Sequence, residues 1–568
     1  MSASLRFLDD ALSVEFTDAL LRKNLLTEAQ LGELQSRAVL TGKTTGQLIT
    51  EENNIPEDTL LAIYAELSGI PFKNIAEFKI PPEAINLAQA KVALRHHVIP
   101  VQYENSILTL ATARVPTLQM VDGLRMLLDI PLDWVLVNDA DLSRTLTHFY
   151  GLGAETIDQL ILEAEDSDDE DVDIAAKTEE TGMVKFIQLI IAEAIRMDAS
   201  DIHVEPFERS LRLRYRIDGI LQEIPLPKGV ERLKRAVASA IKIKANADIA
   251  ERRKPHDGRI KIRHNNNEYD LRVSILPACW GETCCLRILN RGSTRVDLDH
   301  LGLSPATLPK IEKLTDLPHG VILLTGPTGS GKTTTLYALL ARINTGEQKI
   351  ITVEDPIEYQ MSGIDQVQVH SKIDLTFASI LRNILRHDPD VILIGEIRDG
   401  ETADIAVRSS LTGHLVLSTL HTNDAPSAFT RLTDMDIEPY LISSCVEGVI
   451  AQRLLRRVCP QCRDPFEPPS KILAEITALY PDKTPNFIKG HGCPNCAFTG
   501  YRGRTAITET MLTTDEIRAL VIDRKPANII KQQALLDGMI TLRQDGWLRV
   551  VDGRTSVEEV LRVTGREG

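Results

Sequence analysis

The sequence predicts an α/β protein of several domains, on the basis of three observations. Its 568 residues, 43% of them hydrophobic and 25% charged, suffice for about three to five domains of ordinary globular composition. The apolar stretch 321–324 precedes a glycine-rich loop and the helical pattern 336–340, which together predict a strand, a loop and a helix. Segments 211–217 and 269–275 alternate apolar and polar residues, the pattern of strands in a half-solvated antiparallel sheet.

Charge and hydropathy argue against several classes of protein. The formal net charge of −16 opposes a general attraction to nucleic acid. No uninterrupted apolar run approaches the roughly 20 residues of a transmembrane helix. Asp9 and Asp10 follow the first apolar residues too early for a signal peptide. We therefore expect a cytoplasmic protein.

The N-terminal region, residues 1–155, is predicted to hold short amphipathic helices within 11–70 and a small α/β module within 72–150. Thr27 and Gln30 form the capping box of one such helix. Pro56 suits the first position of another helix. The module alternates strand-like and helical segments, at 98–103, 107–111 and 116–128.

The clearest domain boundary is acidic and lies within residues 156–182. Segment 163–180 contains ten acids and a single base, Lys177. It cannot bury enough apolar surface to offset the entropy of ordering, which predicts a flexible, self-repelling linker. The alternative is an acidic docking peptide for a basic partner.

The glycine-rich loop has the pattern of a phosphate loop, G-x-x-x-x-G-K-[ST]. It consists of Gly326, Pro327, Thr328, Gly329, Ser330, Gly331, Lys332, Thr333 and Thr334. Glycines let backbone N–H groups turn toward phosphate oxygens, and the helix that follows adds its positive N-terminal end. Lys332 can reach the β- and γ-phosphates and Thr333 can hold Mg²⁺. The alternative is a glycine-rich turn without a ligand, but the flanking strand and helix favour an ATP site.

Two further predicted strands end in acids. Strand 391–394 leads to Glu396, which we assign as general base or water positioner and as a Mg²⁺ ligand. Strand 350–353 leads to Glu354, Asp355 and Glu358, which would repel one another unless a cation lay among them. Bound Mg²⁺–triphosphate would supply that cation, with Asp355 as a ligand. In both cases the alternative is a solvated acid at a strand end.

A third buried strand is predicted between His414 and His421. Either ring could contact phosphate or relay its loss to a neighbouring domain. A lone histidine is more often a structural hydrogen-bonding group, so the pair, rather than either residue alone, indicates a site.

Together these four segments resemble the signature boxes of the secretion-superfamily ATPases, the hexameric motors of type II secretion and type IV pilus assembly. The similarity is strong from about residue 183 to 568 and weaker before the acidic segment. It includes 199–206, Arg216–Gly219 and 252–259. The resemblance implies a RecA-like P-loop ATPase lobe (301–568), a PAS-like sheet-and-helix lobe (183–300), nucleotide between them and a ring of six subunits.

Family members place arginines of the smaller lobe at the γ-phosphate. Arg272 and Arg287 match those positions, and Arg259 is a weaker candidate. Arginine would neutralise the charge that develops on the phosphoryl oxygens. The alternative is that these arginines form the solvent face of an alternating strand. The sequence departs from the family at Cys284-Cys285, where small β-branched residues are usual and where we expect only packing to change.

Two C-x-x-C pairs, Cys459 with Cys462 and Cys493 with Cys496, predict a closed tetrahedral zinc site within 456–500. Unrelated thiols and a redox dithiol are the alternatives. We expect the other four cysteines to be buried small hydrophobes. Zinc ribbons also bind DNA, and arginines lie nearby in the sequence. In the family, however, this element belongs to assembly motors and faces an inner-membrane platform protein, whereas retraction motors generally lack it.

Residues 16–68 resemble the part of these ATPases that docks onto a cytoplasmic-membrane partner. Some relatives bind cyclic di-GMP there through repeated Arg-Leu-Gly-x-x-Leu-x-x-x-Gly motifs. The best-aligned stretches here, 15–24 and 44–53, lack the arginine and the closing glycine. We therefore expect no tight cyclic di-GMP binding.

The sequence thus predicts a cytoplasmic hexameric ATPase, peripheral at the inner membrane, that powers assembly of pilin-like subunits with ATP, Mg²⁺ and structural Zn²⁺. A nucleic-acid-translocating or DNA-uptake motor is the alternative, and the acidic charge opposes it. A nucleotide-gated scaffold without turnover is a third hypothesis, which the intact acids at 354–358 and 396 oppose.

Overall fold

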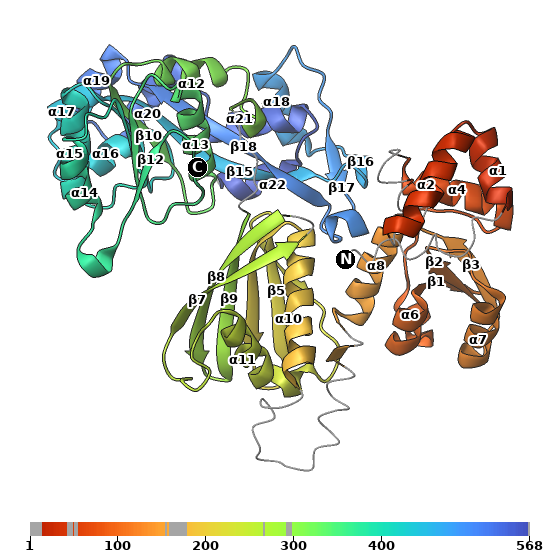
Figure 1. Ribbon diagram of the computed structural model, residues 1–568. Coiled ribbons are helices and arrows are strands. Elements are labelled where there is room, and N and C mark those ends of the chain that lie inside the picture. The colour runs from red at the N-terminus through yellow and green to blue at the C-terminus, as the bar shows by residue number, and fades with distance from the viewer. Residues whose placement is uncertain are drawn as a thin grey trace. The chain divides into compact units, whose positions relative to one another are not determined.

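A computed structural model describes residues 14–41, 49, 55–153, 156–157, 179–264, 267–290 and 298–565 (Figure 1). Residues 158–178 of the predicted acidic linker (156–182) lie outside these ranges, whereas 156–157 and 179–182 are helical, so a helix begins earlier than predicted. The chain forms two compact units, Met1–Asn290 with Gly492–Thr499, and Arg291–His491 with Gly500–Gly568. Within the described ranges, every helix is too short or too polar to cross a membrane.

The first unit begins with three helices packed around a small core: α1 (Val14–Arg22), α2 (Glu28–Thr41) and α4 (Glu57–Ser68). The rings of Phe16 and Tyr64 stack in this core with centroids 4.1 Å apart. The predicted capping box is confirmed, since Gln30 N donates to Thr27 Oγ1 and Thr27 N to Gln30 Oε1. Pro56 is the N-cap of α4 and not its first helical residue, which is Glu57, so the predicted position is wrong by one residue.

The predicted small α/β module is confirmed. Its sheet has the order β1-β2-β3, antiparallel between the first two strands and parallel between the last two. The strands are β1 (Val98–Glu104), β2 (Ile107–Thr112) and β3 (Leu132–Leu136). The helices are α5 (Pro82–Leu87), α6 (Ala90–His96), α7 (Leu118–Leu128) and α8 (Asp139–Tyr150), after the short turn η2 (Ile75–Glu77).

A six-stranded antiparallel sheet follows, with the order β6-β5-β4-β9-β8-β7. Its strands are β4 (Ala199–Pro206), β5 (Leu211–Ile217), β6 (Ile220–Ile224), β7 (His256–His264), β8 (Asn267–Ala278) and β9 (Gly281–Asn290). The helices α10 (Glu179–Arg196) and α11 (Lys234–Lys244), the second preceded by η3 (Val230–Leu233), share one hydrophobic core with the sheet. The predicted half-solvated antiparallel sheet is confirmed, because buried and more exposed residues alternate along β5 and β8.

The second unit is built on a seven-stranded sheet with the order β12-β11-β13-β14-β10-β15-β18. These strands are β10 (Gly320–Thr325), β11 (Ile350–Glu354), β12 (Asp365–Gln368), β13 (Val391–Ile394), β14 (Leu415–Leu420), β15 (Val446–Val458) and β18 (Tyr501–Leu512). All neighbours are parallel except β15 and β18. The central strands β10, β13 and β14 are buried throughout, as expected for a parallel sheet covered on both faces.

Helices surround this sheet and form two core clusters with it. They are α12 (Leu308–Thr315), α13 (Lys332–Ile343), α14 (Phe377–Ile384), α15 (Gly400–Leu411), α16 (Ser427–Asp434), α17 (Pro439–Cys445), α19 (Asp515–Ile522), α20 (Ala527–Leu536), α21 (Leu542–Val551) and α22 (Val557–Thr564), with the short turns η4 (Leu298–Leu301) and η5 (Ser371–Ile373). Figure 1 shows α14, α15 and α17 close together on one side of the sheet, where they pack against β11, against β10 and β14, and against β15, respectively.

The long ribbon formed by β15 and β18 was not predicted from the sequence. Between its strands lie β16 (Arg463–Pro465), α18 (Ser470–Leu479), β17 (Ile488–Gly490) and the short turn η6 (Pro494–Cys496). The two C-x-x-C pairs therefore occur in an excursion from a continuous antiparallel ribbon.

Candidate nucleotide site and cysteine cluster

The predicted catalytic segments follow parallel strands of the seven-stranded sheet. Thr325 of β10 lies opposite Leu420 of β14, and Ile394 of β13 lies opposite Val353 of β11. The residues that come next along each strand therefore meet at one edge of the sheet. In open α/β sheets this carboxyl-terminal edge is where ligands bind.

The phosphate loop connects β10 to α13 and has the backbone that its glycines permit. Gly326 and Gly331 have φ angles of +146° and +87°, in the region that side chains other than glycine rarely adopt. A Cβ atom on Gly326 would lie 2.6 Å from the carbonyl oxygen of Gln452. A Cβ atom on Gly331 would lie 2.8 Å from Nε2 of the same glutamine. The loop thus fits a backbone cradle for phosphate that tolerates no side chain at these two positions.

Lys332 is the first residue of α13, and its ammonium group turns back over the loop. It donates to the carbonyl oxygens of Gly326 at 2.6 Å and Pro327 at 3.2 Å. Burial lowers the pKa of Lys332, and the neighbouring charge of Arg453 lowers it further. An anion close to Nζ would oppose both effects by favouring the charged lysine.

Gln452 of β15 braces the phosphate loop with Arg453 beside it, and neither residue was predicted from the sequence to lie at the site. The fully buried Gln452 amide donates to Ser330 O at 2.9 Å and accepts from the Thr335 hydroxyl at 2.8 Å. Arg453 Nη2 donates to Asn423 O at 2.9 Å. A signal was present, because this polar pair directly follows the apolar residues 449–451, where a parallel strand would end.

Glu396 lies at the same edge and is held by neighbouring strands. Gly395 N donates to Val353 O at 2.8 Å, and the Thr419 hydroxyl donates to Gly395 O at 2.8 Å. The carboxylate lies 2.5 Å from Arg398 and 3.5 Å from His421 Nε2. The hydrogen bond to Glu396 raises the pKa of Arg398. Glu396 and His421, which were both predicted to follow buried strands, are therefore neighbours.

Glu354 is the buried member of the acid cluster. The hydroxyl of Tyr337 donates to its carboxylate, as do the Thr352 hydroxyl at 2.6 Å and Gln366 Nε2 at 3.1 Å. Burial, and then the adjacent carboxylate, raises the pKa of Tyr337. Hydrogen-bond donors thus stabilise the Glu354 carboxylate, where the sequence alone predicted a cation.

Asp355 and Glu358 differ from Glu354 because both side chains are exposed. The backbone N–H of Glu358 donates to the Tyr337 hydroxyl at 3.4 Å. Asp355 lies close enough to Arg398 to raise the pKa of that arginine. Of the three acids, Asp355 and Glu358 are the two whose side chains remain accessible.

The structure separates His414 from the other predicted site residues. Gly320, at the start of β10, pairs with Leu415, so His414 lies at the amino-terminal edge of the sheet, opposite the phosphate loop. Its Nδ1 lies 2.8 Å from Ser409 O and 3.0 Å from the Thr412 hydroxyl. Within its own unit His414 therefore lies away from the phosphate loop, and its ring makes the structural hydrogen bonds of the alternative. The other predicted role, to relay phosphate loss to a neighbouring domain, stays a prediction.

The predicted arginines of the six-stranded sheet belong to a row of charged residues on neighbouring strands. Cross-strand pairing places Arg259 opposite Arg272, Arg272 opposite Arg287, Arg287 opposite Asp201, and Asp201 opposite Arg216. Directly paired residues share a face of a sheet, so four arginines and one acid share this face. Arg287 Nε donates to Asp201 at 2.9 Å, which together with Arg216 keeps the pKa of Asp201 low despite its burial.

The four paired cysteines converge. Their sulfur atoms all lie within 4.8 Å of one another and all four residues are buried, with Cys493 Sγ and Cys496 Sγ 3.7 Å apart. Tetrahedral coordination with Zn–S bonds of about 2.3 Å requires sulfur atoms about 3.8 Å apart. The cluster fits zinc and belongs to no other predicted site.

The prediction for the scattered cysteines is only half correct. Cys284 and Cys445 are buried, and burial raises the pKa of the Cys284 thiol to about 12. Cys285 is half-buried and Cys279 is exposed, because it lies in the turn between β8 and β9.

Comparison with known protein families gives two matches. A family model described as "Type II/IV secretion system protein" matches residues 176–562. The chain belongs to this family. A second model, described as "MshEN domain", matches residues 68–156.

Relatives of known identity match almost the entire chain. It is 39% identical over 554 residues to the type IV pilus assembly ATPase PilB of Myxococcus xanthus, covering 96% of this chain and 98% of that protein. It is 44% identical over 490 residues to the type II secretion system protein E of Pectobacterium carotovorum, covering 84% and 96% respectively. A solved structure of the pilus retraction motor PilT with bound ADP is 26% identical and covers 66% of this chain and 96% of that chain, with a TM-score of 0.45. The predicted resemblance to secretion and pilus-assembly ATPases, and with it the predicted ATPase fold and enzyme class, is confirmed.

Proposed function

We propose that this protein hydrolyses ATP to power the assembly of pilin-like subunits, in type II secretion or in type IV pilus assembly. One observation carries the proposal: a complete phosphate loop, the strand-end acids and His421 lie at one edge of the parallel sheet of a chain that belongs to the secretion ATPase family. The two relatives match 96% and 84% of this chain, which is more than the sheet lobe and the ATPase lobe together and favours an assembly motor of similar organisation.

Each residue of the edge is assigned a part in phosphoryl transfer. The loop amides and Lys332 would bind the phosphates, and Thr333, Asp355 and Glu396 would hold Mg²⁺, which neutralises phosphate charge when bound. Glu396 would orient and deprotonate the attacking water, and His421 at 3.5 Å would respond to its protonation state. Glu354 and Glu358 are both hydrogen-bonded to Tyr337. The Glu354 carboxylate accepts from its hydroxyl, and the backbone N–H of Glu358 donates to that hydroxyl.

Arg272 and Arg287 of the charged row would supply positive charge to the γ-phosphate, as arginine fingers do. Arg287 is already oriented by Asp201, which reduces the conformational entropy that it would lose on binding. We place Arg259 in the same row as a lesser contributor.

We assign zinc to Cys459, Cys462, Cys493 and Cys496, where it would play a structural part. In the proposed machine this element faces the inner-membrane platform protein, the N-terminal region docks onto a cytoplasmic-membrane protein, and six copies form the ring. The protein would be cytoplasmic and peripheral to the inner membrane through these partners.

Tight cyclic di-GMP binding is not expected. The stretch 15–24 falls largely within the helix α1, and nearly all of 44–53 lies outside the described residues. Titration of the full chain with cyclic di-GMP by calorimetry should show no micromolar affinity, and an affinity of that order would overturn this expectation.

A nucleic-acid motor is disfavoured by the net charge of −16, which opposes binding to DNA. Among the arginines near the cysteine pairs in the sequence, Arg456 forms a 2.7 Å ion pair with the buried Glu559, and Arg453 donates to Asn423 O. The others, Arg457, Arg463, Arg502 and Arg504, are exposed, so the arginines alone do not decide against DNA.

The test is steady-state phosphate release by the full chain with and without DNA, together with rescue of a host that lacks the assembly ATPase. We expect ATP turnover that DNA does not stimulate, and rescue of secretion or piliation by the wild type but not by Lys332→Ala. Strong stimulation by DNA, or rescue by Lys332→Ala at wild-type level, would overturn the proposal.

A further inference from the structure

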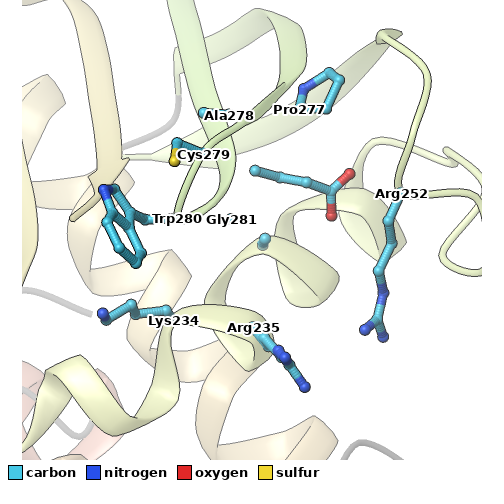
Figure 2. A pocket seen from close by; sticks show the side chains of 10 residues that line it. Lys234, Arg235, Arg252, Pro277, Ala278, Cys279, Trp280 and Gly281 are labelled. Carbon is cyan, nitrogen blue, oxygen red and sulfur yellow. The ribbon is translucent and has the colours of Figure 1, made fainter. Parts of the chain in front are cut away.

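A pocket in the six-stranded sheet lobe is not accounted for by nucleotide chemistry. It has a volume of about 350 Å³ and is lined by the start of α11, by Arg252 and by the turn between β8 and β9. Figure 2 shows Lys234 and Arg235 along one side, with Trp280 and Cys279 opposite them and Arg252 across the opening. The pocket has the size of a ligand site but lies within one lobe.

The pocket is basic in a strongly acidic protein. Lys234, Arg235 and Arg252 each contribute a positive charge. Its single carboxylate, Glu282, forms a 2.5 Å ion pair with Lys242, whose side chain is fully buried. Because that acid is already neutralised, the three cations remain uncompensated inside the pocket.

Two of the three cations are accessible and one is fixed at the rim. Among the described residues, the exposed guanidinium groups of Arg235 and Arg252 have no carboxylate partner. Lys234 Nζ donates to the carbonyl oxygens of Phe207, at 2.5 Å, and Glu208, at 2.8 Å. These bonds hold the ammonium in place and leave one of its three donors for another acceptor.

Trp280 adds an apolar wall to this basic pocket. Its side chain is 51% exposed at the tip of the turn, where no packing requirement of the sheet demands an aromatic residue. An exposed tryptophan next to arginines is typical of a surface that binds a peptide, because it provides contact area at little cost in conformational entropy.

The chain itself contains a segment with matching charge. Residues 163–173 include eight acids and no base. They belong to a connection of 21 residues, 158–178, between Ile157 and α10. Both ends are anchored in the same lobe as the pocket, since Ile157 and the α10 residue Phe186 share one core.

The connection is long enough to reach the pocket. Twenty-one residues span up to about 70 Å when extended. Leu152, five residues before Ile157, is tied to the segment that leads to α11, because its backbone N–H donates to Pro225 O at 3.0 Å. The effective concentration of so short a tether is in the millimolar range, so even weak charge pairing is sufficient for docking.

We propose that the pocket formed by Lys234, Arg235, Arg252 and Trp280 binds the acidic segment 163–173 of the same chain. Acids of the segment pair with the two accessible guanidinium groups, and its backbone covers Trp280. The interaction is electrostatic between partly exposed groups and is therefore sensitive to salt. It does not depend on the proposed ATPase function.

Tryptophan fluorescence of the full chain tests the proposal directly. The chain has three tryptophans, and Trp134 and Trp547 are buried, so neutral acrylamide mainly quenches Trp280. Neutralising Asp168, Asp169, Glu170 and Asp171 to amides should increase the quenching constant by about twofold, as should Arg235→Glu with Arg252→Glu. Added salt at 0.5 M should have the same effect on the wild type and little effect on these variants.

The matched control makes the same change in charge on exposed residues of β7, with Lys261→Glu and Arg263→Glu, and should quench like the wild type. If quenching is equal in the wild type, the neutralised segment and the pocket variant, the proposal is wrong.

Cross-linking identifies the occupant. Asp169→Cys should form a disulfide with Cys279 within one chain under mild oxidation, and Cys279→Ser should abolish it. A disulfide between two chains would instead assign the pocket to a second copy, and the absence of any cross-link would contradict docking.

Discussion

The two large sheets of this protein use their residues for function in different ways. In the seven-stranded parallel sheet, the functional groups stand just beyond the strands, where Gly326, Glu396 and His421 share one edge. In the six-stranded antiparallel sheet, they stand within the strands, where Arg272 and Arg287 face each other across β8 and β9. The first arrangement gathers a phosphate cradle and acids, and the second a row of positive charge.

This difference determines how each site tolerates change. Groups at the parallel edge depend on loops that neighbouring strands hold, as Thr419 holds Gly395. Groups in the antiparallel row are fixed by strand pairing and by one shared acid, Asp201. Substitutions at the parallel edge should therefore abolish ATP hydrolysis, whereas substitutions in the arginine row should lower kcat by amounts that depend on the position in the row.

The largest effect is expected at the parallel edge. Glu396→Gln should lower kcat by roughly 10²–10⁴-fold while ATP still binds, because the amide cannot accept the proton of water. Lys332→Ala should lose both turnover and tight ATP binding. Phosphate release and binding of a fluorescent ATP analogue measure the two properties separately. Turnover by Glu396→Gln at the wild-type rate would falsify the assignment.

The antiparallel row should respond next. Arg272→Ala and Arg287→Ala should each lower kcat by about 10²-fold or more, with little change in unfolding temperature. Arg259→Ala should have a smaller effect. Arg263→Ala, on the same strand as Arg259 but outside the row, is the matched control and should turn over normally. Equal losses for Arg263 and Arg287 would show that general charge, not position, matters.

The ribbon that leaves the parallel sheet gives a third test. Cys459→Ser should remove the bound zinc, about one atom per chain in the wild type, and lower the unfolding temperature, since a structural site contributes to folding. Metal analysis and thermal unfolding measure these effects. Cys279→Ser, at the exposed turn, should change neither. Full metal content in Cys459→Ser would exclude the tetracysteine site.

The smallest effect is expected at the brace of the phosphate loop. Gln452→Ala should cost about 1–3 kcal/mol of stability, because Ser330 O and the Thr335 hydroxyl lose a buried partner. It should also weaken ATP binding without changing the pH profile of kcat. Chemical denaturation and nucleotide titration test this, and a variant as stable as wild type would show that the brace is dispensable.

Much of the parallel edge could be predicted from the sequence because its residues are local. A phosphate loop and an acid after an apolar strand occupy a few consecutive positions, so a single sequence reveals Lys332 and Glu396. The same pattern misled for His414, since a histidine before a strand looks like one after it until strand direction is known. The brace by Gln452 and the row from Arg259 to Arg216 depend on register between distant strands, which local patterns do not encode.

The exposed Cys279 is another residue whose position could not be predicted from local sequence. Composition and compartment predict a buried thiol, but a turn between two strands outweighs that preference because its residues cannot reach the core. Arginines on an alternating strand likewise predict only a solvent face. The cross-strand pairing of Asp201 with Arg287 and Arg216 shows that these arginines belong to one row of charged residues.

The 13-residue strand β15 has a mechanical consequence. It pairs with β18 along most of its length and with β10 as far as Ala451, and it ends one residue before Cys459. Stretching the strand would break several of these hydrogen bonds at once, so it resists extension as far as the irregularity in its pairing between Arg456 and Val458. Gln452, which is hydrogen-bonded to the phosphate loop, lies seven residues, or about 23 Å, from Cys459 along this strand. The phosphate loop and the cysteine cluster are thus joined through a single strand, so a displacement of the loop has a direct path toward Cys459.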